Sequence, residues 1–521
     1  MNFMFLFFSK PSLCKHLTRT NYLFIALLVA LGVSPVVQAD TPIKGFEIQS
    51  SYEEWKLPHH ETMGMARIGL REKFGQYFNA GVDSYAAVKG ERGGFITLGL
   101  AGGFEYPITS SLSIESGLFV GAGGGRGGYE LTGGGLMLRE NIGLKYQFAK
   151  FASLSLGMSH VDFPNGGVIK GNQLYAGFNV PFNALIDTDK PYRGKDYISG
   201  ISLDLYQPRV HQFSIHGKQI SVPSGVRTDA GGAQNSFSLI GAGWRTYIDN
   251  HWFAQLESAG AARGNSRGYM EILLGGGYQL PLTEKLAAYA SLSVGGAGGG
   301  SVNTGGGLLF DGSVGAQYFL SKRWFADASV FQRWAGDTSF KATGLGLKLG
   351  YQFGGQATSA DGVLNNAVFD SHPLRIRMVN QTYTKASENW RNRPNQNVNN
   401  LGAQVDYFID PEWFITGQGL GAYGGDAGAY MTGLLGTGVR THITRNIFAE
   451  LEGLVGAAGG GGLNTGGGLV YQANLGLGYQ LNKNLEVMGT IGQMRAAKGD
   501  FQANVYGISL AYKFNALTFR K

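Results

Sequence analysis

The amino-acid sequence predicts an all-β protein: a transmembrane antiparallel β-barrel built from three tandem repeats of eight strands, about 24 strands in total. Three observations predict this class. One glycine-rich motif occurs three times in constant surroundings, apolar and polar residues alternate over long segments, and the connections between those segments alternate between short and long.

The repeated motif is Thr-Gly-Gly-Gly-Leu, which starts at Thr132, Thr304 and Thr465. In each copy a tyrosine follows the threonine by 14 positions and a lysine follows it by 18 positions. Spacing this constant indicates three copies of one structural unit. The expected boundaries are residues 40–182, 197–353 and 374–521 for the repeats, and 183–196 and 354–373 for polar connectors between them.

The segments between turns alternate at period two, as strands between two different environments do. From Leu469 to Leu481 every second residue is apolar, and the residues between them are mostly small or polar. The runs are about 10 to 13 residues long, the length of a tilted membrane strand. In the third repeat the strands are expected at Leu374–Tyr383, Leu401–Ile409, Phe414–Tyr423, Ala429–His442, Ile447–Ala457, Gly468–Leu481, Leu485–Arg495 and Ala503–Phe514.

The connections differ in length on the two sides of the predicted sheet. Residues 107–111 and 281–285 form tight turns, each with a turn-like threonine, whereas residues 88–94 and 262–268 form longer polar loops. Short turns on one side and longer loops on the other are typical of strands that cross a bilayer.

The first 39 residues are predicted to be a secretory signal, because basic residues precede the apolar run Tyr22–Val33 and a small-residue site at Ala39. Cys14 is the only cysteine, so the mature chain would have no disulfide and no thiolate metal site. Removing three basic residues lowers the net charge from +7 to +4, which is too mild to indicate a nucleic-acid partner.

The signal, the absence of cysteine, the alternation and the last strand, Val505–Phe514, resemble those of Gram-negative outer-membrane β-barrel proteins. The resemblance implies an outer-membrane location, contact with outer-membrane lipid and lipopolysaccharide, and insertion by the barrel-assembly machinery, which reads an aromatic-ended last strand. The chain departs from the family pattern because Asn515–Lys521 follow the final aromatic residue. The arginines expected to meet lipopolysaccharide phosphates are Arg92, Arg263, Arg267, Arg391 and Arg393.

The strands could close as a single large barrel or as three eight-stranded barrels. Long connectors favour three barrels. We expect a single barrel, because small inward residues such as Gly143, Gly315, Gly476 and Gly478 would fill a narrow barrel poorly. About five residues precede the first strand, too few for a plug, so loops would have to narrow the pore. The candidate loops are residues 207–234, residues 385–400 and the three glycine-rich hairpins.

The glycine-rich hairpins are not phosphate loops, because no Lys-Ser/Thr pair follows them. One interpretation is that glycine supplies positive φ and close strand approach at a tight hairpin. The other is a rim where the backbone of a polymer or partner approaches closely. The candidate pore or loop glycines are Gly133, Gly134, Gly135, Gly305, Gly306, Gly307, Gly466, Gly467 and Gly468.

Four charged residues are predicted to point inward. Glu115 and Glu450 occupy equivalent positions, six residues after their turn threonines, and Lys145 and Lys348 could pair with them. They would form a buried network in a narrow barrel or line a wide pore.

No cofactor and no metal ion are expected. In His59-His60-Glu61, adjacent strand residues would point to opposite faces, and no third ligand follows at a recognised spacing. The segment around His160 faintly resembles lipid A deacylases, which place a serine two residues after the histidine and an asparagine next. Here Asp162 and Phe163 hold those places, so no catalytic role is assigned.

These features predict a non-enzymatic, porin-like passage for a polar solute or an exported polymer, with the glycine-rich loops narrowing its mouth. The first alternative is a structural or adhesin-type protein of three closed eight-stranded barrels that meets a surface partner. The second alternative is an outer-membrane lipid-modifying enzyme.

Overall fold

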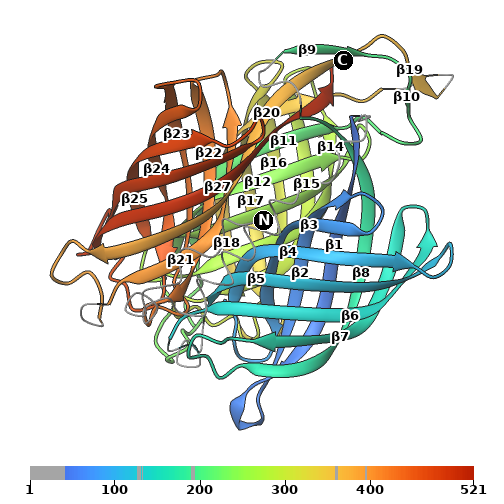
Figure 1. Ribbon diagram of the computed structural model, residues 1–521. Coiled ribbons are helices and arrows are strands. Elements are labelled where there is room, and N and C mark those ends of the chain that lie inside the picture. The colour runs from blue at the N-terminus through green and yellow to red at the C-terminus, as the bar shows by residue number, and fades with distance from the viewer. Residues whose placement is uncertain are drawn as a thin grey trace, which may run out of the picture. The chain divides into compact units, whose positions relative to one another are not determined.

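The computed structural model describes residues 42–125, 131, 133–188, 194–357, 359, 362–392 and 396–520 (Figure 1). The predicted secretory signal, Thr132 and Arg393 lie outside the described residues. Among the described residues, no helix is long and apolar enough to cross a membrane.

Barrel 1 is drawn from blue to cyan in Figure 1. Each of its eight strands pairs antiparallel with the next, and the first pairs with the eighth, with Phe46 opposite Phe182. The eight strands therefore close on themselves. They are β1 (Ile43–Lys56), β2 (Thr62–Phe74), β3 (Phe78–Lys89), β4 (Ile96–Pro107), β5 (Leu112–Gly124), β6 (Leu136–Ala149), β7 (Ala152–Asp162) and β8 (Lys170–Asp187), with the short 3-10 helix η1 (Pro58–His60) after β1.

Barrel 2, drawn from green to yellow, closes in the same way, because its first strand pairs with its last along Val210–Ser221. Its strands are β11 (Val210–Ser221), β12 (Phe237–Tyr247), β13 (Trp252–Arg263), β14 (Met270–Pro281), β15 (Leu286–Gly298), β16 (Leu308–Phe319), β17 (Trp324–Ala335) and β18 (Lys341–Gly354).

Barrel 3, drawn from orange to red, closes through pairing of its first and last strands, with Leu374 opposite Phe514. The intervening strands pair in sequence order. Its strands are β20 (Ala367–Lys385), β21 (Val398–Phe408), β22 (Trp413–Gly424), β23 (Met431–His442), β24 (Ile447–Gly459), β25 (Leu469–Gln480), β26 (Leu485–Ala496) and β27 (Gln502–Phe519).

The expectation of a single large barrel is therefore wrong, because each group of eight strands uses its own first and last strand to satisfy both edges. The inward glycines do not leave voids, since larger side chains cover them: aromatic side chains at Gly143, Gly315 and Gly478, and Met488 at Gly476. A Cβ on Gly315 would lie 2.7 Å from the ring of Tyr289, and a Cβ on Gly478 would overlap the ring of Phe448. The volume missing at each of these glycines is therefore supplied by a larger side chain from another strand of the same barrel.

The described parts of the connectors contain short strands of their own, which the sequence pattern did not predict. They are β9 (Lys195–Ile198), β10 (Ile201–Ser202) and β19 (Val363–Leu364). The strand β9 pairs with β20, and β10 pairs with β19. The residues after Phe514 extend β27, where Asn515–Leu517 pair with the end of β8. The C-terminal extension thus links barrels 1 and 3.

The tight turns share one side-chain hydrogen bond. The hydroxyl of Thr109 accepts from the backbone N–H of Leu112 at 3.0 Å, and Thr283 and Thr444 do the same three residues on. At Asp249, the N–H groups of Trp252 and His251 donate to the carboxylate, both at 2.7 Å, and hold the pKa of that carboxyl below its usual range. The predicted turn threonines therefore fix the short-turn ends of the barrels.

Candidate functional site

The outside of the barrels is apolar. On β18, Leu345, Leu347 and Leu349 are exposed, and the residue between the last two, Lys348, points inward. Aromatic pairs lie at the short-turn ends, such as Trp324 and Tyr351 with ring centroids 5.2 Å apart. Soluble monomers rarely expose apolar surface of this extent. Closed barrels with this exterior and charged interiors define the class of the protein, a transmembrane β-barrel.

Barrel 3 is crossed by a network of buried ion pairs. Arg375 on β20 reaches across the lumen to Glu450 on β24, with Nη1 and Oε1 2.7 Å apart, and its Nε lies 2.6 Å from Asp406. Arg440 joins the same Glu450 to Glu486, with N–O distances of 2.7 and 2.8 Å. A buried charge needs such partners, because leaving it unpaired away from water is costly.

Barrel 2 has an equivalent network built from different positions. Lys218 on β11 lies 2.8 Å from Glu257 on β13 and 3.3 Å from Glu271 on β14. Arg333 on β17 pairs with Glu271 and Asp311, both at 2.7 Å. Arg333 and Asp311 lie opposite each other on the neighbouring strands β17 and β16. The other pairs join strands that are not neighbours, so those side chains span the lumen.

Barrel 1 is filled in the same manner. Arg139 on β6 pairs with Glu53 on β1 at 2.8 Å, and Arg71 pairs with Asp83 at 2.6 Å. Arg139 also lies over the rings of Tyr85 and Tyr175, 5.6 and 5.3 Å from their centroids. The lumen is therefore closed by cations, carboxylates and aromatic rings together.

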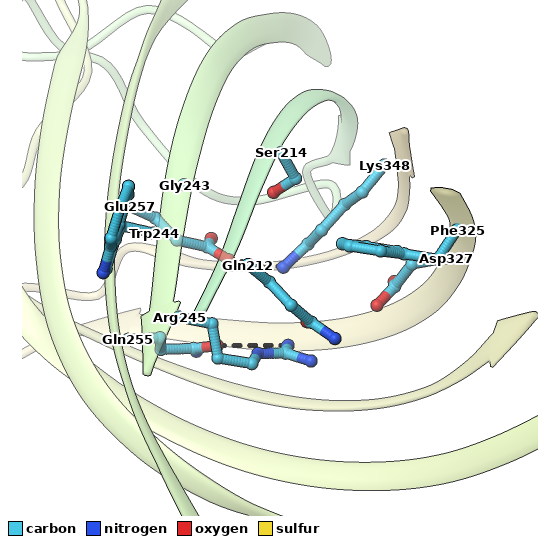
Figure 2. A pocket seen from close by; sticks show the side chains of 10 residues that line it. All are labelled: Gln212, Ser214, Gly243, Trp244, Arg245, Gln255, Glu257, Phe325, Asp327 and Lys348. Atoms are coloured by element: carbon cyan, nitrogen blue, oxygen red, sulfur yellow. Dashed lines mark hydrogen bonds and ion pairs between the residues drawn. The ribbon is translucent and has the colours of Figure 1, made fainter. Parts of the chain in front are cut away.

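A small cavity of about 10 Å³ remains in barrel 2 (Figure 2). Gln212, Arg245, Asp327 and Lys348 are among its lining residues, and Arg245 donates to Gln255 at 3.3 Å. A cavity in barrel 1 has a volume of about 20 Å³. Both volumes are far below the roughly 300–1,000 Å³ typical of small-molecule pockets. Neither cavity provides a wide passage.

Apolar clusters occupy the long-loop ends of the barrels. In barrel 3, Trp390 is buried and its ring stacks on Phe501 with centroids 6.3 Å apart. Trp390, in the loop 385–400 that was expected to narrow a pore, therefore packs into the end of one barrel. Within residues 207–234, the stretch 210–221 is strand β11, and Val226 packs in the apolar cluster of barrel 2.

The four predicted inward charges lie inside barrels and form networks, but not with the partners expected. Lys145 pairs with Glu47 at 2.6 Å and Glu105 at 3.0 Å. Glu115 accepts hydrogen bonds from Tyr175 at 2.7 Å and Ser155 at 3.1 Å.

Lys348 pairs with Glu257, and Glu450 pairs with arginines. These arginines were not predicted as partners from the sequence. They could have been, because Arg375 and Arg377 occupy inward positions of a strand with alternating residues.

The glycine-rich hairpins lie against neighbouring barrels. The N–H of Gly93 in barrel 1 donates to the carbonyl of Gly305 in barrel 2 at 2.8 Å. A Cβ on Gly306 would lie 2.5 Å from the backbone carbon of Lys89 in barrel 1. We call this contact between a glycine-rich hairpin and the adjoining barrel a clasp. It depends on missing side chains, because only glycine lets two backbones come this close.

The other two hairpins make corresponding clasps. In barrel 1, the N–H of Gly135 donates to Ala422 of barrel 3 at 2.9 Å, and the carbonyl of Gly133 accepts from Asp426 at 3.3 Å. In barrel 3, a Cβ on Gly468 would overlap the carbonyl of Ala261 in barrel 2. The three clasps follow one cyclic order. The hairpin of barrel 2 contacts barrel 1, the hairpin of barrel 3 contacts barrel 2, and the hairpin of barrel 1 contacts barrel 3.

The first sequence interpretation of the glycines, positive φ and close backbone approach, applies to this geometry, whereas approach by a polymer or a partner stays a prediction. Gly305, Gly307, Gly466 and Gly468 have φ values of 57, 100, 58 and 96°, which favour glycine. Gly306 has no such φ, so its need for glycine comes from the neighbouring backbone. The described hairpin residues contact other barrels of the chain. A role in narrowing a mouth stays a prediction.

The arginines that were expected to meet lipopolysaccharide phosphates differ in burial and in hydrogen-bond partners. Arg92 donates to Glu61 at 2.7 Å, and Arg391 is buried and donates to the carbonyls of Gln396 and Gly425 at 2.9 and 2.8 Å. Arg263 and Arg267 are exposed. Lipopolysaccharide contact stays a prediction for these two, whereas Arg391 holds a loop in place.

His160 has a hydrogen-bond partner on the neighbouring strand. The Nδ1 atom of His160 lies 2.6 Å from the Oδ1 atom of Asn172, and Asp162 pairs with Lys170 at 2.7 Å. Among the described residues, no group of three or more His, Cys, Asp or Glu side chains could hold a metal ion.

No family model matches the chain, and no curated protein matches it. Solved structures with low similarity include the siderophore receptor PirA from Pseudomonas aeruginosa, with a TM-score of 0.27 and 10% identity over 92% of this chain and 81% of that one. OpdQ from Pseudomonas aeruginosa has a TM-score of 0.21 and 11% identity over 91% of this chain and 98% of that chain. OccAB3 from Acinetobacter baumannii has a TM-score of 0.19 and 11% identity over 91% of this chain and 99% of that chain. The class of the protein follows from its own strand pairing and surface.

Proposed function

We propose that the chain is an outer-membrane structural protein, a unit of three filled, non-conducting barrels that presents its long loops to a surface partner. The single observation that carries this proposal is the filling of the lumens. Pairs such as Arg375–Glu450 and Glu53–Arg139 cross barrels at 2.7 and 2.8 Å. An eight-stranded barrel has an interior that side chains can fill, in contrast to the water-filled channel of larger porins.

The outer-membrane location is supported by the apolar exterior, the aromatic ends of the strands and the predicted secretory signal. Bacterial outer-membrane barrels have short turns on the periplasmic side and longer loops outside. The long-loop ends would then face the exterior, where the exposed Arg263 and Arg267 could meet anionic lipid headgroups.

Solute passage is the second candidate function. The polar lining of the barrel 2 cavity, which includes Arg245, Asp327 and Lys348, favours it. Passage through one barrel would require its ion pairs to separate and its apolar cluster to move. A small polar solute is compatible with such a route, whereas an exported polymer is not, because the cavity has a volume of only about 10 Å³.

Planar-bilayer recording of the folded, purified protein tests the proposal. Filled barrels predict no stable open conductance, with a known porin inserted under the same conditions as the positive control. A stable conductance in most insertion events would overturn the structural role and favour solute passage. Insertion is checked independently by protease protection in liposomes, so that an absence of conductance can be attributed to a closed protein.

A further inference from the structure

The three barrels meet through corresponding strands. Strand β3 contacts β15, β13 contacts β24, and β22 contacts β5, so the third strand of each barrel meets the fifth strand of another. The fourth strands, β4, β14 and β23, therefore lie between the contacts in each barrel. Ile96 and Leu98 of β4, Met270 and Ile272 of β14, and Met431 of β23 form one apolar cluster with Ala86.

This cluster occupies only the long-loop ends of the fourth strands. Ile96 is 1% exposed and Met431 is 9% exposed. Farther along the same face of β14, Leu274 is 46% exposed and Leu280 is 49% exposed. The face that is buried between barrels at one end is therefore uncovered toward the short turns.

The uncovered face carries no charge. In β3–β5, β13–β15 and β22–β24, all described, the outward positions between the inter-barrel cluster and the short turns hold no Asp, Glu, Lys, Arg or His. The outward Lys89 and Arg263 lie at the opposite, long-loop ends of β3 and β13. At its short-turn end the face is bordered by the exposed rings of Phe104, Tyr106 and Tyr278. Aromatic rings favour the boundary between hydrocarbon and headgroups, so the face lies at hydrocarbon depth.

We propose that this face binds the acyl chains of phospholipid from the short-turn leaflet, held between the three barrels. The inference rests on the membrane location in the proposed function. Hydrocarbon is the chemistry that matches an uncharged face continuous with the apolar inter-barrel cluster, and the aromatic border places the headgroups near the short turns.

Two glycines provide a matched test. Gly433 lies on β23 two residues beyond Met431, and Gly489 lies on β26, which pairs with β25 and β27. Both glycines are exposed, and a Cβ at either position would have no atom within 4 Å. A phenylalanine fits at both sites without a clash, but only Gly433→Phe places a ring on the proposed lipid face.

The experiment measures phospholipid that remains with the full-length protein after purification in a mild detergent, by native mass spectrometry and phosphorus content. Wild-type protein and Gly489→Phe are expected to retain the same phospholipid, and Gly433→Phe to lose half or more. Gly453→Phe on β24, also at an open position, is expected to reduce retention in the same direction.

Equal retention in all variants would overturn the lipid site. A co-purified polypeptide or a second copy of the chain that Gly433→Phe displaces would also overturn it, because the face would then be a protein interface. A different result is expected if the proposed membrane location is wrong. The wild-type protein would then stay soluble without detergent and carry no phospholipid.

Discussion

Phe448 lies against Gly478, its register partner on the neighbouring strand inside barrel 3. A side chain on Gly478 would overlap the ring, and the guanidinium carbon of Arg440 lies 3.9 Å from the centroid of that ring. Glycine, ring and cation thus form successive layers from the barrel wall inward. Phe253 opposite Gly277, with Arg245 at 4.0 Å, forms the same arrangement in barrel 2.

We expect Gly478→Ala to destabilise the folded protein, because the new Cβ must displace the Phe448 ring and the arginine behind it. Overpacking of a filled interior costs about 1–3 kcal/mol. The measurement is urea unfolding in detergent micelles, followed by tryptophan fluorescence. Gly453→Ala is the control, since its Cβ would meet no atom within 4 Å. Equal midpoints for the two variants would contradict the layered packing.

Glu450→Gln removes one carboxylate from the Arg375 and Arg440 network while keeping the side-chain shape. Breaking a buried pair costs roughly 3–5 kcal/mol, because the arginines lose charge compensation away from water. A lower temperature for the heat-induced shift in gel mobility would report this loss. The matched control is Glu388→Gln, whose partner Lys385 lies 3.2 Å away at an exposed site, where pairs contribute about 0–1 kcal/mol. The network would be unimportant if both variants behaved alike.

Gly306→Ala should weaken the clasp between barrels 1 and 2, because its Cβ would lie 2.5 Å from Lys89. The equivalent Gly467→Ala should be tolerated, since its nearest atom would be 3.5 Å away. The test uses proteins with a protease site in each connector. After cleavage, native gels run over a series of temperatures measure the temperature at which barrel 2 separates from the other barrels. We expect separation at lower temperature for Gly306→Ala only. Separation of both variants at the wild-type temperature would show that the clasp does not hold the barrels.

Leu517→Ser tests the C-terminal extension. Leu517 is buried in a cluster with Leu185, Ile201 and Phe369. Truncating a buried leucine costs about 2–5 kcal/mol, so the connector strands should open locally. Trypsin cleavage after Lys195 on β9 should then become faster, while the barrels stay heat-modifiable. Leu205→Ser, at a position that is exposed, is expected to leave the cleavage rate unchanged. An unchanged rate for Leu517→Ser would remove any role of the extension in joining barrels 1 and 3.

Much of the strand pattern was predictable, because inside and outside of a barrel demand different residues at alternate positions. In the third repeat, the expected strand Ile447–Ala457 differs from the observed β24, Ile447–Gly459, by two residues at one end. The ion-pair partners were not predictable in the same way. Lys145 and Glu115 were both expected inside, but the pairing of Lys145 with Glu47 and Glu105 depends on which strands face each other across a closed lumen.

By itself, the sequence determined the strand segments, their inward and outward faces, the turn threonines and the recurrence of the glycine-rich motif. These features are local, since they depend on alternation and turn chemistry within a few residues. Tertiary structure decided how many barrels those strands form, because closure depends on whether β1 meets β8 or another strand. It also decided the role of the motif: Gly306 needs to be glycine because the backbone of another barrel lies against it, a contact between residues more than two hundred positions apart in sequence.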